Sequence, residues 1–518
     1  MWLFYVMAAL IALIIVKDSL SVIKYYACYK SQGMPFRYVP IIGVLRYFLT
    51  TDKKDSMAAW KALGQCTKQD EGIVAINHPY EPHPSLLLTS PEIVKEFCEK
   101  DNEFCDRILP LELPVKIGFL MQSGEHALKK RRIFSKFFLQ KHLNKITPLI
   151  EKITIKKFEF IKKDLLRLSR GDAKKFQKID LQEYWKGLSS ELVNGIMFGA
   201  NDYPKVDGMT IPNAIRYLLR TTVTEIDNHP LNLIFFMMPS KLGLLPQCKP
   251  MKELYQKIEK ACLDMYKKRS RLRPEERGCN LVDLMVENNL NCPEDEILDE
   301  ENIIGNLFLF QIAGMDTSRQ VATMSIHHLS KNPHLSSQLY SGVVKDLFKN
   351  GGKKLIGDME SLEKSVFLNK YLKEALRIFA PTVMHFPRRA TRNFKLGKYK
   401  IYKGDFLVVA VSVLHYDPNL FEDPKEFKVD RFSDSQAFAK ASRNCSYVPF
   451  SSGNRGCIGK YLANIFMKVG LSHFIKEFEV TEDEEFDPKM EFGFTSGYKE
   501  CWVKLRPRSA GSVNGDSE

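Results

Sequence analysis

The sequence predicts a mainly α-helical protein with small β-sheets, formed by one large domain behind an N-terminal membrane anchor. Residues 1–16 are apolar throughout, which suits an anchor. Most of residues 55–380 show helical periodicity interrupted by Gly and Pro, whereas runs of strand-forming residues come late in the chain. The 518 residues are 44% hydrophobic and 27% charged, an ordinary globular composition that excludes a mainly disordered chain.

The apolar run 1–16 is short for a membrane span, which needs roughly 20 residues, but the Lys17 stem can extend to the interface. No basic segment precedes the run and no clear cleavage site follows it, which disfavours a cleaved signal peptide. Lys24 and Lys30 lie after the run, so the positive-inside rule predicts a cytosolic domain. We expect an anchor and flank over 1–30, the main domain over 31–508 and a disordered tail over 509–518.

Two basic amphipathic helices are predicted at 127–143 and 148–168, the second with Thr147 as N-cap and Pro148 at its first position. The longest predicted helix runs from Glu300 to Lys331, after the N-cap Asp299 and before Pro333.

Short strands are expected at 394–402, with a turn at Gly397, and at 406–411. A last long helix is expected at 458–476.

Charge and cysteine usage restrict the function classes. The net charge of +14 suits an anionic membrane surface, an acidic protein partner or nucleic acid, but no recognised nucleic-acid motif accompanies it. The 11 cysteines are scattered without a CxxC pair, which argues against a disulfide framework and against a zinc finger. A reducing compartment is therefore expected.

The most informative stretch is FSSGNRGCIG, residues 450–459. Gly453 allows a tight turn, Arg455 places a cation two residues before Cys457, and Gly459 lets backbone N–H groups approach the sulfur. The N-terminus of the following helix lowers the pKa of a thiol at this place. Such a thiolate suits a metal ligand, and the alternative for any single cysteine is a buried structural residue.

The pattern FxxGxRxCxG resembles the haem-binding loop of the cytochrome P-450 family. The resemblance implies one large haem domain of the P-450 fold, with Cys457 as the axial thiolate ligand of a haem b iron and Phe450 shielding the sulfur. Such a thiolate pushes electron density onto the iron and favours O–O cleavage.

Three further motifs follow in the order that the family shows. Glu374 and Arg377 form an ExxR pair on one helix face, and Arg431 in Val-Asp-Arg-Phe is similar to the family's Pro-Glu-Arg-Phe segment. The resemblance implies a buried network of these three side chains beneath the haem. By itself, an ExxR pair is more often a solvated surface pair.

Residues 313–317, Ala-Gly-Met-Asp-Thr, lie in the middle of the longest predicted helix. Ala313 and Gly314 leave space for a ligand, and the Thr317 hydroxyl can bond the carbonyl of the preceding turn. The stretch resembles the family's oxygen-activating acid–alcohol pair, which implies proton delivery by Asp316 and Thr317. A helix weakened by glycine, with an ordinary polar pair, is the alternative.

Haem carries two propionates, which arginine binds well. The candidates are Arg455, Arg388 and Arg131. Arg131 falls at the arginine of the family's WxxxR helix, but Ala127 replaces the tryptophan. A solvated basic face is the alternative for residues 129–132.

The resemblance implies a monooxygenase in the endoplasmic reticulum membrane that receives electrons from an NADPH-dependent flavoprotein reductase. Residues 129–132, Lys460 and Arg443 are a candidate docking patch for it. A lipophilic substrate is expected, and family analogy draws its pocket from 108–121, 308–313, Val383, Met384 and the turn near Phe494. The run 231–238 is either pocket, membrane contact or core. A thiolate-haem isomerase or dehydratase acting on a peroxide, and a non-catalytic binding protein, are the alternative functions.

Overall fold

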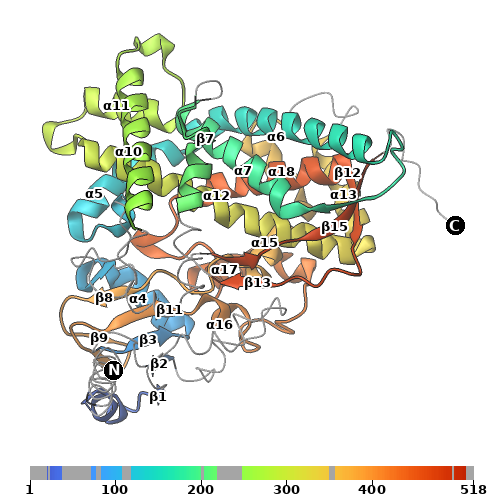
Figure 1. Ribbon diagram of the computed structural model, residues 1–518. Coiled ribbons are helices and arrows are strands. Elements are labelled where there is room, and N and C mark those ends of the chain that lie inside the picture. Colours follow the sequence, from blue (N-terminus) through green and yellow to red (C-terminus); the bar gives the residue numbers. More distant parts are fainter. Residues whose placement is uncertain are drawn as a thin grey trace, which may run out of the picture.

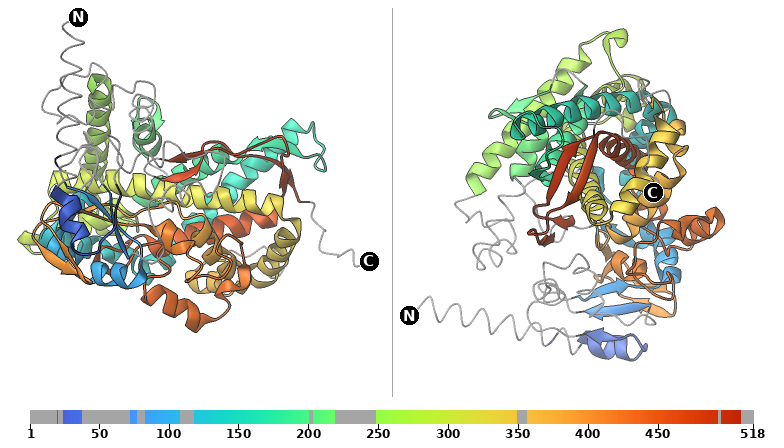
Figure 2. Two further views of the ribbon diagram at one scale, coloured as in Figure 1. Left: turned by 90° about the horizontal axis from the view of Figure 1, so that it is seen from below. Right: turned by 90° about the vertical axis from the view of Figure 1, so that its right-hand side faces the viewer.

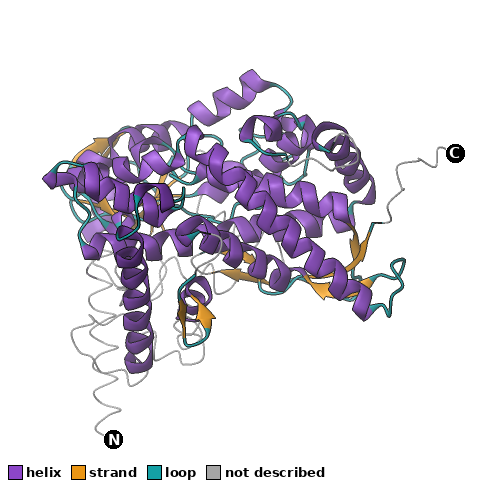
Figure 3. Cartoon of the chain, turned by 90° about the horizontal axis from the view of Figure 1, so that it is seen from above, coloured by secondary structure: helices purple, strands orange, loops and turns teal. Residues whose placement is uncertain are grey.

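The computed structural model describes residues 20, 24–37, 72–76, 83–107, 118–199, 203–218, 248–348, 356–492 and 495–508. Helices dominate, and the strands form only small sheets (Figure 3). The prediction of a mainly helical protein with minor β-structure is confirmed for these residues. The predicted anchor, most of the linker that follows it and the tail lie outside them.

The described helices are, in chain order, α4 (Pro91–Phe104), α5 (Gly124–Ser135), α6 (Gln140–Leu168), α7 (Leu181–Phe198), α10 (Cys248–Ser270), α11 (Leu281–Asn291), α12 (Glu300–Lys331), α13 (Pro333–Leu347), α14 (Met359–Glu363), α15 (Val366–Ile378), α16 (Val411–His415), α17 (Ser435–Arg443) and α18 (Lys460–Glu477). Residues 24–30 and 211–218 are also helical. Short 3-10 turns include η1 (Phe119–Met121), η2 (Lys136–Phe138), η6 (Val429–Phe432) and η7 (Gly453–Arg455).

The largest sheet has the order β1-β2-β3-β11-β8-β4, made by β1 (Phe36–Arg37), β2 (Ile73–Ile76), β3 (Ser85–Leu88), β11 (Phe406–Val409), β8 (Arg388–Ala390) and β4 (Cys105–Arg107). It lies at one end of the molecule, apart from most of the helices (Figure 1). A second sheet joins β12 (Phe478–Glu482), β15 (Trp502–Pro507) and β5 (Gln177–Asp180), all antiparallel. The remaining pairs are the hairpins β6 (Lys205–Val206) with β7 (Met209–Thr210), β9 (Phe394–Leu396) with β10 (Tyr399–Ile401), and β13 (Met490–Phe492) with β14 (Ser496–Tyr498).

Helix α12 is the central element, and it crosses almost the whole helical part of the molecule (yellow in Figure 2). It packs against α7 and against α18. Its predicted bounds are confirmed: Asp299 caps it by accepting a hydrogen bond of 2.7 Å from the Asn302 N–H, and Pro333 begins the next helix.

The predicted boundary between the two basic helices is wrong. Helix α6 starts at Gln140, after the 3-10 turn η2, and continues through Pro148 to Leu168. Thr147 does not cap a helix, because its Oγ1 donates to the Leu143 carbonyl oxygen one turn back, at 2.8 Å. The stripe around Pro148 is buried, and this packing outweighs the hydrogen bond that proline removes.

The late strands are close to their predicted places. The expected turn at Gly397, with φ of 56°, joins β9 to β10. Strand β11 ends two residues earlier than predicted, since Val411 already starts α16. The last long helix, α18, begins at Lys460 rather than at 458.

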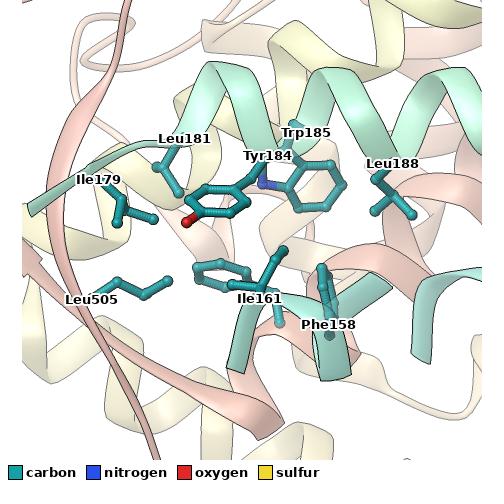
Figure 4. A pocket seen from close by; sticks show the side chains of 9 residues that line it. Phe158, Ile161, Ile179, Leu181, Tyr184, Trp185, Leu188 and Leu505 are labelled. Carbon is teal, nitrogen blue, oxygen red and sulfur yellow. The ribbon is translucent and has the colours of Figure 1, made fainter. Parts of the chain in front are cut away.

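A small void of about 10 Å³ lies between α6, α7, β5, β15 and α18. Its lining is almost entirely apolar, with Trp185 and Tyr184 on one side and Ile161 and Phe158 on the other (Figure 4). A space of this size holds at most one water molecule. It is a packing gap of the core and not a binding site.

Candidate active site

The cysteine loop is a tight backbone turn between Phe450 and the start of α18. The Cys457 N–H donates to the Phe450 carbonyl oxygen at 2.8 Å, and the Gly456 N–H to the Gly453 carbonyl oxygen at 3.0 Å. Gly453 has φ of 68°, and a Cβ placed there would lie 2.1 Å from the carbonyl oxygen of Cys98 in α4. The loop can therefore pack on α4 only with glycine at this position.

Cys457 lies inside the fold, but its side chain is still accessible to solvent. Burial raises the pKa of its thiol, while the Gly459 N–H, Arg131, Arg107 and Lys460 act in the opposite direction. Since the side chain is still exposed, we infer that it faces a hollow inside the fold. Gly459 leaves room there, because a Cβ on it would lie 3.9 Å from the Cys457 sulfur.

Arginines surround this loop. Arg131 of α5 donates from Nη2 to the Gly456 carbonyl oxygen at 2.6 Å. Arg107 donates from Nη2 to the Arg455 carbonyl oxygen at 2.9 Å. Its backbone lies opposite that of Arg388, because β4 and β8 are neighbouring antiparallel strands. Arg388 and Arg455 are both buried. The structure therefore brings the three predicted arginines and Arg107 to the same region.

The middle of α12 lies across the hollow from the cysteine loop. Phe138 connects the two sides: its ring would contact a Cβ on Gly459 at 3.8 Å, and its centroid lies 5.7 Å from that of Phe310. One turn further along α12, Gly314 is exposed although most of the helix around it is buried. The nearest atom to a Cβ on Gly314 belongs to Val193 of α7, at 3.6 Å.

The acid and the alcohol on α12 have different hydrogen bonds. Thr317 donates from Oγ1 to the Ala313 carbonyl oxygen at 2.7 Å, which leaves its oxygen lone pairs able to accept. One oxygen of Asp316, Oδ1, accepts from Arg216 Nη2 at 3.2 Å and from Arg319 Nη2 at 3.1 Å. These two ion pairs were not predicted from the sequence.

The ExxR helix, α15, carries a buried ion-pair network. Glu374 and Arg377 are fully buried and meet at 2.7 Å, and Arg431 Nε reaches Glu374 Oε1 at 3.0 Å. Arg377 Nη1 also donates to the carbonyl oxygens of His415 and Pro424, each at 2.7 Å. The guanidinium N–H groups are thus largely satisfied, which a buried charge requires.

His415 links this network to the cysteine loop. Its Nε2 accepts from the Val448 N–H at 3.0 Å, so the proton sits on Nδ1, which lies 3.1 Å from the Arg377 carbonyl oxygen. The nearby Tyr447 ring stacks on the imidazole at 5.4 Å. Sequence reasoning missed His415 and Arg107, because neither belongs to a local pattern. His415 only ends an apolar run that begins at Phe406, which is a weak signal.

Comparison with known proteins identifies the family. The sequence profile described as Cytochrome P450 matches residues 74–500. The chain belongs to the cytochrome P450 family. It is an oxidoreductase of the monooxygenase type, and the cofactor of the family is a thiolate-ligated haem.

Three relatives illustrate the similarity. Putative cytochrome P450 CYP13A5 of Caenorhabditis elegans is 24% identical over 518 residues, covering 91% of this chain and 93% of its own. Probable cytochrome P450 6a23 of Drosophila melanogaster is 24% identical over 423 residues, covering 79% and 80%. Cytochrome P450 3A28 of Bos taurus is 23% identical over 511 residues, covering 94% and 93%.

The residues around the hollow fit a haem. In the described part of the chain, no cluster of three or more His, Cys, Asp or Glu side chains is placed to hold a metal ion. Cys457 and Gly314 are both exposed, although each lies among residues that are buried or partly buried. Arg131, Arg388, Arg455 and Arg107 offer the cations that two propionates need.

Several predicted features fall on residues that the structure does not describe. They include 1–16, most of the pocket segment 108–121, the run 231–238, Phe494 and the tail. Searching the described helices for a stretch that is long and apolar enough to cross a bilayer finds none.

Proposed function

We propose that the protein is a membrane-anchored haem-thiolate monooxygenase that inserts one atom of dioxygen into a lipophilic substrate, with electrons from an NADPH-dependent flavoprotein reductase. The observation that carries this proposal is the exposed sulfur of Cys457 in an interior hollow, beneath the middle of α12 and among arginines. In this proposal the thiolate of Cys457 would bind the haem iron. The haem supplies the redox and oxygen-transfer chemistry when bound.

The cysteine loop holds that ligand in place. Gly453 allows the tight turn that carries the sulfur, the Phe450 carbonyl oxygen accepts from the Cys457 N–H at 2.8 Å, and the Phe450 ring would shield the sulfur. Arg131, Arg388 and Arg455 would bind the propionates of the haem, together with Arg107. The network of Glu374, Arg377 and Arg431 supports the loop from below through His415.

Proton delivery is assigned to α12. Ala313 and Gly314 leave a small-residue stretch open to the hollow, where oxygen has room beside the helix. Thr317 accepts a hydrogen bond there, because its own proton is committed to the Ala313 carbonyl oxygen. Asp316 passes protons from water through Oδ2, the oxygen that no described residue bonds.

The aromatic core beside the middle of α12 supports an apolar substrate. Phe310 on α12 packs with Phe119, Phe134 and Phe138, at centroid distances of 6.0, 5.4 and 5.7 Å. Val383 and Met384, expected at the pocket, are only partly buried. Such a lining favours compounds that also partition into a membrane. The anchor at 1–16 and the endoplasmic reticulum location belong to the same proposal.

A reductase would dock beside the cysteine loop. A groove of about 300 Å³ opens there, lined by Phe450, Ser451, Ser452 and Lys460 among others. It also contains Lys373 and Lys468 against the single carboxylate of Glu363, so it is positively charged. Arg443 and Arg132 are exposed as well. Association with an acidic partner should weaken as ionic strength rises.

The alternative of a peroxide isomerase or dehydratase needs no acid beside the hollow. The presence of Asp316, which is paired with Arg216 and Arg319 in the middle of α12, favours oxygen activation instead. The two functions are separated by measuring consumption of NADPH and dioxygen by the full chain with a reductase. Substrate-dependent consumption supports the monooxygenase, and conversion of a lipid hydroperoxide without consumption of NADPH supports the isomerase.

A further inference from the structure

A buried chain of hydrogen bonds leads from Asp316 away from the hollow. Arg319, one turn along α12, contacts Asp316 Oδ1 with Nε at 3.3 Å and with Nη2 at 3.1 Å. Its remaining nitrogen, Nη1, donates to Oε1 of Gln182. Gln182 belongs to the first turn of α7, and both side chains are more than nine-tenths buried.

Gln182 is itself held from the other side. Its Nε2 donates to Gln320 Oε1 at 2.8 Å and to the Tyr498 carbonyl oxygen of β14 at 2.7 Å. Gln320 is pressed against β14 as well, since a Cβ on Gly497 would lie 2.1 Å from its amide oxygen. The amide of Gln182 therefore cannot rotate without losing three hydrogen bonds inside the protein, and each such loss is costly.

This arrangement decides which oxygen of Asp316 is available. All three contacts that the two guanidinium groups make with Asp316 go to Oδ1, and no described residue bonds Oδ2. Arginine prefers to bind a carboxylate through both oxygens. Arg319 instead places both Nε and Nη2 on Oδ1, and the hydrogen bond from its Nη1 to Gln182 opposes a rotation of the guanidinium group towards Oδ2.

We propose that Gln182 is a positioning residue for proton delivery: by occupying Nη1 of Arg319, it keeps Oδ2 of Asp316 free to bind water. This rests on the function proposed above, in which Asp316 passes protons towards the hollow. Without an acceptor at position 182, a buried N–H of Arg319 has no partner. Arg319 then turns onto both oxygens of Asp316 and removes the proton acceptor.

The experiment compares Gln182→Met with Gln182→Glu in the full-length haem protein. Methionine keeps the length of the side chain but offers no strong acceptor, whereas glutamate keeps the acceptor oxygen for Arg319. Turnover of a 7-alkoxycoumarin probe is driven either by NADPH and reductase or by cumene hydroperoxide. The hydroperoxide brings an oxygen that is already reduced and protonated, so it bypasses the delivery of protons by the protein.

With NADPH, we expect Gln182→Met to lower product formed per NADPH by about tenfold, with the difference appearing as hydrogen peroxide. Gln182→Glu should recover most of it, and hydroperoxide-driven turnover should stay unchanged in both. Equal losses with both oxidants, or a loss in Gln182→Glu as large as in Gln182→Met, would overturn the proposal in favour of a purely structural role.

Two further variants complete the design. Asn194→Leu removes another buried amide of α7 that has no hydrogen bond to the described residues, and it should leave the product yield unchanged. Asp316→Asn tests the proposed function itself. If Asp316→Asn keeps normal yield, the assignment of the acid fails; if it loses yield while Gln182→Met does not, only the role of Gln182 fails.

Discussion

The Nε2 atom of His415 accepts a hydrogen bond of 3.0 Å from the backbone N–H of Val448. Burial, together with the nearby Arg377, lowers the pKa of His415 to about 3, so the ring is neutral at physiological pH. A neutral ring can accept at one nitrogen and donate at the other, which the two contacts require. This single side chain thus joins the buried ion-pair network to the segment that leads into the cysteine loop.

Removing one partner of the ion-pair network should destabilise the protein strongly. Arg377→Ala leaves the Glu374 carboxylate buried with only part of its contacts, at a cost of about 3–5 kcal/mol. We expect little folded haem protein, and a lower midpoint of urea unfolding for what is recovered. Lys370→Ala is the control, because its partner Asp430 is exposed. A midpoint for Arg377→Ala within error of that control contradicts a structural role for the network.

Gly453→Ala should displace the cysteine loop. An alanine must adopt φ of 68°, which costs about 1–2 kcal/mol, and its Cβ would lie 2.1 Å from the Cys98 carbonyl oxygen. We expect a weaker retention of haem, measured by titration with apomyoglobin. Gly208→Ala is the control, because Gly208 has a similar φ of 77° but open space around it. This variant therefore shows the effect of backbone strain without a contact of the new Cβ. Equal haem retention in the two variants would mean that the contact with α4 is unimportant.

Thr317→Val should impair oxygen use without impairing haem binding. Valine has the same shape as threonine but cannot accept a hydrogen bond in the hollow. The yield of product per NADPH should therefore fall by about tenfold or more, with the difference appearing as hydrogen peroxide. Thr323→Val, on the same helix, is the matched control. The readout is product and peroxide per NADPH at unchanged absorbance of the ferrous–CO complex, and an unchanged product yield in Thr317→Val argues against the relay.

Buried histidines should make the protein sensitive to mild acid. Burial lowers the pKa of His327 to about 4, against roughly 6.5 in the unfolded chain. Between these pH values the unfolded state binds a proton that the folded state excludes. The contribution of neutral His327 to the free energy of unfolding is therefore fully present above pH 6.5, and it is lost as the pH decreases. At pH 5 the loss from this residue is about 2 kcal/mol.

His327→Phe should therefore flatten the dependence of the melting temperature on pH between 7 and 5, by comparison with the unchanged protein. The variant of an exposed histidine, His334→Gln, should follow the curve of the unchanged protein. A curve for His327→Phe that is parallel to the original shows that His327 is not excluded from protonation in the folded state.

Motifs with a local pattern could be predicted from the sequence, and contacts between distant elements could not. The bounds of α12 follow from Asp299 and Pro333, and the turn at Gly397 follows from one glycine between strand-forming residues. The break between α5 and α6 was misplaced, because tertiary packing and not the Thr147-Pro148 signal decides it.

The same distinction holds at the candidate site. The cysteine loop, the ExxR pair and the stretch 313–317 are each continuous in sequence, so their residues could be named in advance. Arg107, Arg216, His415 and Gln182 are single residues that reach the site from other elements. Nothing in their neighbourhood along the chain distinguishes them from ordinary polar residues, since their partners lie far away in sequence.

The most direct measurement is the absorption spectrum of the reduced protein with carbon monoxide, in Cys457→Ser and Cys445→Ser side by side. Cys445 lies twelve positions earlier and is buried, and burial raises the pKa of its thiol as well. The account predicts that Cys445→Ser keeps the strongly red-shifted Soret band of a thiolate-ligated haem and that Cys457→Ser loses it. A red-shifted band that survives in Cys457→Ser, or disappears in Cys445→Ser with the haem still bound, would contradict the assignment of the ligand.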